Sequence, residues 1–68
     1  RHLARLRPRD PIVHYNLACS YSLLGQKTEA VRSLERAVEF GYSDVDYMEA
    51  DEDLANVRND ERYRALAA

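Results

Sequence analysis

The sequence predicts an all-α protein, built from an antiparallel helix-turn-helix hairpin that is followed by short C-terminal capping helices. Three observations support this fold class. Apolar residues recur at helical spacing between residues 10 and 42. Gly25 and Gly41 follow the two periodic segments, where a left-handed residue commonly ends a helix. Beyond Gly41, aspartates recur in front of short apolar segments, as helix N-caps do.

The first helix is expected to begin at Asp10-Pro11 and to extend to about Leu24. An aspartate side chain accepts hydrogen bonds from the free N–H groups of the first turn, and a proline at the first helical position needs no donor. One apolar stripe follows helical spacing and is predicted to face a neighbouring helix: Val13, Leu17, Ala18, Tyr21 and Leu24, with His14 in the same arc.

The second helix is expected from about Lys27 to Phe40. Its predicted apolar face consists of Ala30, Val31, Leu34, Ala37 and Val38, and the opposite face is charged: Glu29, Arg32, Glu35, Arg36 and Glu39. Only two or three residues connect this helix to the first one. Because so short a connection leaves no room for a crossover, the two helices are expected to pack antiparallel.

Residues 43–68 are predicted to form capping helices. Ser43-Asp44-Val45-Asp46 is similar to a capping box and predicts a short helix to about Ala50. Asp51 and Asp60 are predicted to cap two further turns. Four apolar side chains in this region are expected to cover the hairpin: Leu54, Val57, Tyr63 and Leu66.

The composition excludes several classes of protein. The chain of 68 residues has one cysteine, so it forms no internal disulfide, and two histidines with one cysteine make a poor zinc-binding set. The net charge of −2 predicts no general attraction to nucleic acid or membranes. No apolar run approaches the ~20 residues of a membrane span, and no signal peptide is visible. We therefore predict a cytoplasmic protein.

Two patterns that suggest chemistry have simpler explanations. Cys19 and His14 are separated by roughly 140° around a helix, so they are poorly placed for a nucleophile–base pair. The acidic run that starts at Asp44 has Glu49 where a calcium-binding loop needs glycine, and Ala55 where it needs glutamate. Helix capping and a solvated face explain this run better. We predict that the chain is not an enzyme and has no catalytic residues, cofactor or metal.

The four N-terminal arginines, Arg1, Arg5, Arg7 and Arg9, lack interleaved aromatic residues. Single-stranded nucleic acids are bound by basic grooves that carry such aromatic residues. We therefore interpret these arginines as exposed charge on a helix that faces acidic groups of a neighbour, and we predict no nucleic-acid partner.

The hairpin carries the residue pattern of a known repeat. Leu3–Pro8 aligns with Ala37–Tyr42 at an offset of 34 residues, which is the period of tetratricopeptide repeats. The chain resembles this family: Leu17-Ala18 stands at its Leu-Gly pair, Tyr21 at its aromatic position, and Ala30, Leu34 and Ala37 at its small, large and small positions, while His14 occupies the place usually taken by Trp or another bulky residue. The resemblance implies three parts: residues 1–9 as the tail of a preceding repeat helix, 10–42 as the hairpin, and 43–68 as the cap.

The segment "DEDLANVRNDERYRAL" resembles the closing unit of bacterial repeat arrays, with Glu52 and Glu61 in place of two prolines. The resemblance implies a protein–protein interaction scaffold at the end of an array. A regulatory accessory unit of a larger enzyme or signalling protein is the alternative function. An excised array exposes an unpaired helix face, so self-association is a further expectation.

The first helices of this family line a concave groove, and the matching positions here are Ile12, Tyr15, Asn16, Cys19 and Ser22. The resemblance therefore implies that these five residues bind a partner protein or peptide. Two alternatives stay open: the capping helices cover this stripe, or the stripe packs between repeats. The family's clamp for C-terminal carboxylates is not implied, because Tyr15 and Cys19 replace the Lys and Asn that it needs.

Overall fold

The computed structural model describes residues 9–68, and this part of the chain contains helices and no strand, so the predicted all-α class is confirmed. The elements are α2 (Pro11–Leu23), α3 (Lys27–Glu39), α4 (Val45–Ala50), the 3-10 helix η1 (Glu52–Val57) and α5 (Glu61–Ala67). The expected tail of a preceding repeat lies almost wholly outside the described residues. None of the described helices is long and apolar enough to cross a membrane.

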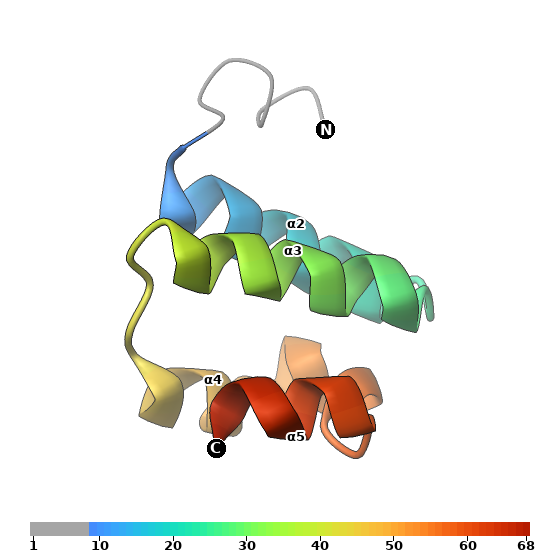
Figure 1. Cartoon of the computed structure of the whole chain (residues 1–68). Helices are drawn as coiled ribbons and strands as arrows, with labels where there is room; N and C mark the ends of the chain where they lie inside the picture. Colours follow the sequence, from blue (N-terminus) through green and yellow to red (C-terminus); the bar gives the residue numbers. More distant parts are fainter. Residues whose placement is uncertain (1–8) are drawn as a thin grey trace.

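The described chain forms two layers (Figure 1). Helices α2 and α3 lie side by side in one layer, and the three residues between them reverse the chain direction. Helices α4, η1 and α5 form the second layer below them. Gly25 and Gly41 have φ angles of 79° and 116°, which side-chain-bearing residues rarely adopt, so these two glycines allow the chain to turn out of α2 and α3.

Aspartate side chains begin four of the five helical elements within residues 9–68. Asp10 Oδ1 accepts from the Ile12 N–H at 2.9 Å, and Asp44 Oδ1 accepts from the Tyr47 N–H at 3.0 Å. Asp51 and Asp60 cap η1 and α5 in the same way. The expected capping box at Ser43 is wrong by one residue, because Asp44 is the side chain that satisfies the first turn of α4.

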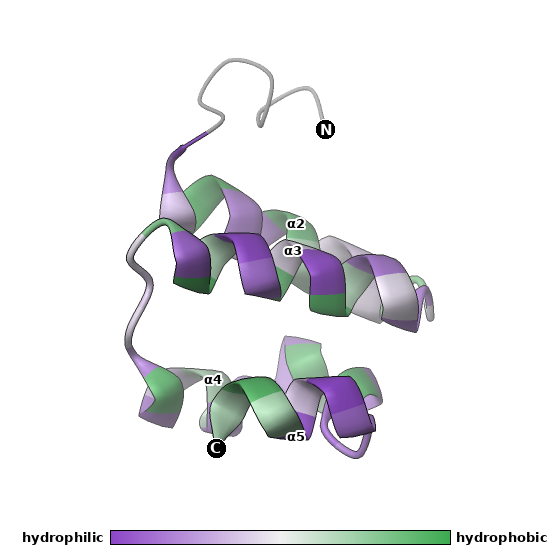
Figure 2. Cartoon of the chain, viewed as in Figure 1, coloured by the Kyte–Doolittle hydropathy of each residue, from purple (hydrophilic) through white to green (hydrophobic). Residues whose placement is uncertain are grey.

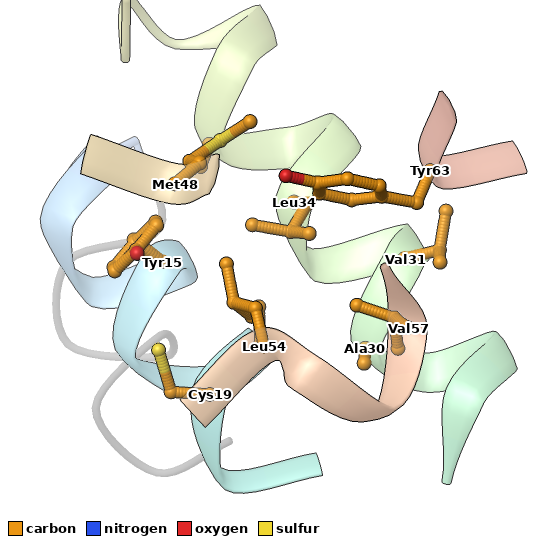
Figure 3. Packing of buried hydrophobic residues seen from close by; sticks show 11 residues of the cluster. Tyr15, Cys19, Ala30, Val31, Leu34, Met48, Leu54, Val57 and Tyr63 are labelled. Atoms are coloured by element: carbon orange, nitrogen blue, oxygen red, sulfur yellow. The ribbon is translucent and has the colours of Figure 1, made fainter. Parts of the chain in front are cut away.

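The core lies between the two layers. Figure 3 shows Leu34 of α3 near Leu54 of η1 and Tyr63 of α5, all of which are at most 1 % exposed. The small residues Ala18, Ala30 and Ala37 are fully buried, which allows the backbones of α2 and α3 to approach closely. Met48 and Val57 of the second layer also belong to this core, and the partly buried Leu66 packs against it.

The predicted apolar face of α3 is buried as expected except for Val38, which is 37 % exposed. Figure 2 shows hydrophobic and hydrophilic stretches alternating along this helix. The predicted stripe of α2 is buried only in part: Ala18 and His14 are buried, Val13, Leu17 and Tyr21 are half-buried, and Leu24 is 70 % exposed. The buried arc of α2 is shifted around the helix relative to this stripe, because the second layer packs against α2 as well, and it consists of His14, Tyr15, Ala18, Cys19 and Ser22.

Candidate functional site

The five α2 residues proposed from the sequence do not form one open surface. Ile12 is 54 % exposed, and Asn16 is also exposed one turn later. Tyr15, Cys19 and Ser22 are at most 9 % exposed and belong to the buried arc. At 3.6 residues per turn the five residues span an arc of roughly 120°: Ile12 and Asn16 lie at its exposed edge, and the three buried residues form a line along the side that faces the second layer.

A hydrogen-bonded cluster holds the buried line against the second layer. The Tyr15 hydroxyl donates to Asp51 Oδ2 at 2.5 Å, and the Cys19 thiol lies 3.8 Å from the same oxygen. The other carboxylate oxygen of Asp51 accepts from the Asp53 N–H at 3.0 Å, which begins η1. Asp51 therefore connects the start of η1 to α2, and Tyr15 and Cys19 serve the packing of the two layers.

The surroundings keep these groups protonated. Burial, followed by the negative charge of Asp51, raises the pKa of the Cys19 thiol from 9.0 to about 11. Burial and the hydrogen bond to Asp51 raise the pKa of Tyr15 above its ordinary range. Cysteine chemistry requires the thiolate, so this environment disfavours a nucleophilic role for Cys19.

We expect iodoacetamide to alkylate Cys19 at pH 8 at least about tenfold more slowly in the folded chain than in the unfolded chain, because the raised pKa lowers the thiolate fraction and the thiol is buried. Mass spectrometry over time measures both rates, with the chain in guanidinium chloride as the unfolded reference. Equal rates in the two states would show that Cys19 is accessible and reactive.

The same shift predicts a pH dependence of stability. A folded-state pKa raised above the unfolded value stabilises the fold fully below the unfolded pKa, and this contribution is lost as the pH rises through the folded pKa. Cys19 therefore contributes below about pH 9 and loses its contribution as the pH rises through 11, and Tyr63, with a pKa raised by burial from 10.0 to about 12, follows at higher pH.

Three potential metal ligands lie together at this cluster. Single donor atoms of Cys19, Asp51 and Asp53 lie within 4.8 Å of one another. However, both oxygens of Asp51 already accept hydrogen bonds, and the thiol is protonated at neutral pH. Zinc in structural sites is held by four ligands, with its cysteines as thiolates. The arrangement is therefore better explained as a packing and capping cluster.

A groove opens beside this cluster, and we call it the tyrosine groove. Its volume is about 560 Å³, and it lies between the start of α2, the loop after α3 and the start of α4. The lining residues are Pro11, Ile12, Tyr15, Asn16, Gly41, Tyr42, Ser43, Asp44 and Tyr47. Of the five sequence-predicted residues, Ile12, Tyr15 and Asn16 therefore line it, whereas Cys19 and Ser22 do not.

Three aromatic rings line the tyrosine groove. The rings of Tyr15 and Tyr42 stack at a centroid distance of 4.7 Å and an angle of 15°, and Tyr47 lies 6.0 Å from Tyr15 at 49°. Tyr47 is 57 % exposed, so its ring is available to a ligand. The sequence interpretation missed Tyr42 and Tyr47. Two local features could have pointed to them: Tyr42 directly follows the helix-ending Gly41, and Tyr47 lies in the first turn of the helix that Asp44 caps.

A second hollow of about 590 Å³ lies on the side of α2 and α3. Its lining residues are mostly polar: His14, Leu17, Tyr21, Glu29, Arg32, Ser33, Glu35 and Arg36. It includes Leu17 and Tyr21 of the stripe that the sequence had assigned to the hairpin seam. Arg1, Arg5 and Arg7, named above as exposed charge, lie outside the described residues, and Arg9 is exposed.

Comparisons with known proteins add one partial relative. No protein-family model matches the chain, and no solved structure matches it. The chain is similar to a chloroplastic protein of Arabidopsis thaliana, with 34 % identity over 55 residues. These residues are 81 % of this chain but only 16 % of that protein, so the similarity covers a small segment of a much longer relative.

Proposed function

We propose that the chain is a protein–protein interaction module that binds a segment of a partner protein in the tyrosine groove. The observation that carries this proposal is the groove itself, because it combines an exposed aliphatic residue, Ile12, an exposed amide, Asn16, and an exposed aromatic ring, Tyr47. Aromatic side chains provide contact area, and an asparagine amide can pair with a peptide backbone.

We further propose that the chain forms the end of a tetratricopeptide array. In support, α2 and α3 each span 13 residues and are joined by a short turn at Gly25. The small positions of the repeat pattern in α3, Ala30 and Ala37, are fully buried. The second layer covers one side of the hairpin, as a terminal cap would.

The alternative is a regulatory accessory unit within a longer enzyme or signalling protein. The similarity to a much longer protein is compatible with this alternative, since the match spans only 16 % of the Arabidopsis protein. Both functions use the module as a binding surface rather than as a catalyst. We propose no catalytic role for Cys19, because its thiol is buried and its pKa is raised. Cytoplasmic location and self-association stay predictions.

The test is the loss of binding after the groove is changed. Random peptides displayed on phage are selected on the immobilised chain, and the recovered peptides are titrated against the double variant Ile12→Ala/Asn16→Ala. We expect affinity to fall about tenfold or more, since truncating a hot-spot residue at the centre of an interface costs about 2 kcal/mol or more. Tyr15 is left unchanged, because it is 5 % exposed and its hydroxyl bonds to Asp51, so its removal would disturb the fold.

The matched control is Arg32→Ala/Arg36→Ala on the exposed face of α3, which also lines the second hollow. This control is expected to bind the selected peptides as the unchanged chain does. Circular dichroism verifies that both double variants remain folded. Unchanged binding by the groove variant would refute the proposal, and loss confined to the arginine variant would in addition place recognition at the second hollow.

A further inference from the structure

We propose that the tyrosine groove recognises an arginine or lysine side chain on the bound segment, so the partner presents a cationic residue next to an apolar one. This inference rests on the proposed function and names the chemistry of the ligand. It follows from the juxtaposition of the exposed Tyr47 ring, the stacked Tyr42 ring and the Asp44 carboxylate in one groove.

Among the lining residues of the tyrosine groove, the charged side chain is the Asp44 carboxylate, and the Asp51 carboxylate accepts the hydrogen bond of the lining residue Tyr15. Residues 43–57 contain six acidic residues and no lysine or arginine: Asp44, Asp46, Glu49, Asp51, Glu52 and Asp53. Helix α2 also contains no lysine or arginine, and the nearest arginine before it, Arg9, is followed at once by Asp10. A negatively charged surface attracts a cationic ligand and repels an acidic one.

The arginine that follows η1, Arg58, is not among the lining residues of the tyrosine groove. The Arg58 guanidinium donates to the carbonyl oxygens of Met48 at 3.1 Å and Asp51 at 2.6 Å. It is therefore committed to the main chain at the junction of α4 and η1. The negative charge of Asp44 reaches the groove wall, because it adds to burial in raising the pKa of Tyr42.

The aromatic rings supply the second part of cation recognition. A guanidinium or ammonium group is attracted to the face of a tyrosine ring within about 6 Å of its centroid. An arginine can place its planar group against the Tyr47 ring while donating to Asp44. Its aliphatic stem can lie along Ile12, which is exposed beside the rings. Asn16 and Ser43 remain for the backbone of the bound segment.

The experiment compares capped peptides that differ at a single position. A short peptide with one arginine between two leucines is titrated into the isotope-labelled 68-residue chain, alongside a twin in which neutral citrulline replaces the arginine. We expect the arginine peptide to shift the amide signals of Ile12, Asn16 and Tyr47, and to bind about tenfold more tightly than its twin at low salt. Raising the salt to about 0.5 M should reduce that difference.

Two pairs of measurements on the protein separate charge from shape. Asp44→Asn removes the charge but keeps a good N-cap for α4, so it should weaken binding of the arginine peptide about three- to tenfold and leave binding of the citrulline peptide unchanged. Tyr47→Phe keeps the ring and should bind normally, whereas Tyr47→Leu keeps an apolar side chain and should lose several-fold affinity for the arginine peptide alone.

Three other outcomes would each refute a specific part of the proposal. Equal affinity of the two peptides, with shifts at Ile12 and Asn16, would refute cation recognition and leave the groove as the binding site. Shifts confined to Arg32, Arg36 and their neighbours would refute both the cation site and the proposed function. The last measurement uses the variant Arg5→Gln/Arg7→Gln of the 68-residue chain. If only this variant binds the arginine peptide, the groove is occupied by the chain's own N-terminal segment, and an external partner is refuted.

Discussion

Replacing Leu34 by aspartate is expected to unfold the chain. Leu34 is fully buried between α3 and the second layer, where Leu54 and Tyr63 surround it. The change removes a core side chain worth about 2–5 kcal/mol and places a charge among apolar side chains. A 68-residue domain has a total stability of roughly 3–10 kcal/mol, so the loss matches or exceeds what holds the fold.

Far-UV circular dichroism with thermal melting measures the effect, and Leu34→Asp should show a large loss of helical signal and no cooperative transition. The matched control is Val38→Asp, one turn later on the same helix. Val38 is 37 % exposed, so its aspartate stays hydrated and should cost about 1 kcal/mol or less. A native, cooperative melt of Leu34→Asp would show that Leu34 is not a core residue.

The ends of the helices could be predicted from the sequence because they depend on local interactions. Asp10, Asp51 and Asp60 cap the elements that they were expected to cap, and α2 and α3 each end within one residue of the predicted position. A cap needs only the N–H groups two or three residues ahead of it, which are adjacent in sequence. The error at Ser43 has the same origin, since two neighbouring side chains were both suitable caps.

The buried side of α2 could not be predicted in the same way. Helix α3 has charged residues on one face, so its apolar periodicity identifies the other face as buried. Helix α2 contains no Lys, Arg, Asp or Glu, and apolar residues lie all around it, so the periodicity does not select one side. The contact with η1 decides the matter, and it buries Cys19 and Ser22 while Leu24 stays exposed.

The tyrosine groove depends on contacts between distant parts of the chain. Tyr15 stacks on Tyr42 and lies near Tyr47, which belong to a loop and a helix far along the sequence. The sequence could place Ile12, Tyr15 and Asn16 near one another on a helix, and all three line the groove. The two aromatic partners required the position of the second layer, which the local pattern does not specify.

Deleting residues 51–68 is expected to abolish cooperative folding of the remaining chain. The deletion removes three side chains that are at most 1 % exposed, Leu54, Val57 and Tyr63. Each of them stabilises the fold by about 1.5–3 kcal/mol through burial. The deletion also removes the Asp51 carboxylate, which accepts the hydrogen bond of Tyr15. The remaining chain would expose a large apolar face of α2 and α3 to water.

The truncated chain should lose its cooperative melt by circular dichroism and should self-associate in sedimentation velocity, because exposed apolar faces associate in water. The control is the full chain with Glu52→Gln/Glu61→Gln. Both glutamates are exposed in the second layer, so this variant changes the charge of the cap and keeps its buried face. It should melt nearly as the unchanged chain does. If the truncated chain stays monomeric with an unchanged melting temperature, residues 51–68 do not stabilise the hairpin, and their role as a cap is refuted.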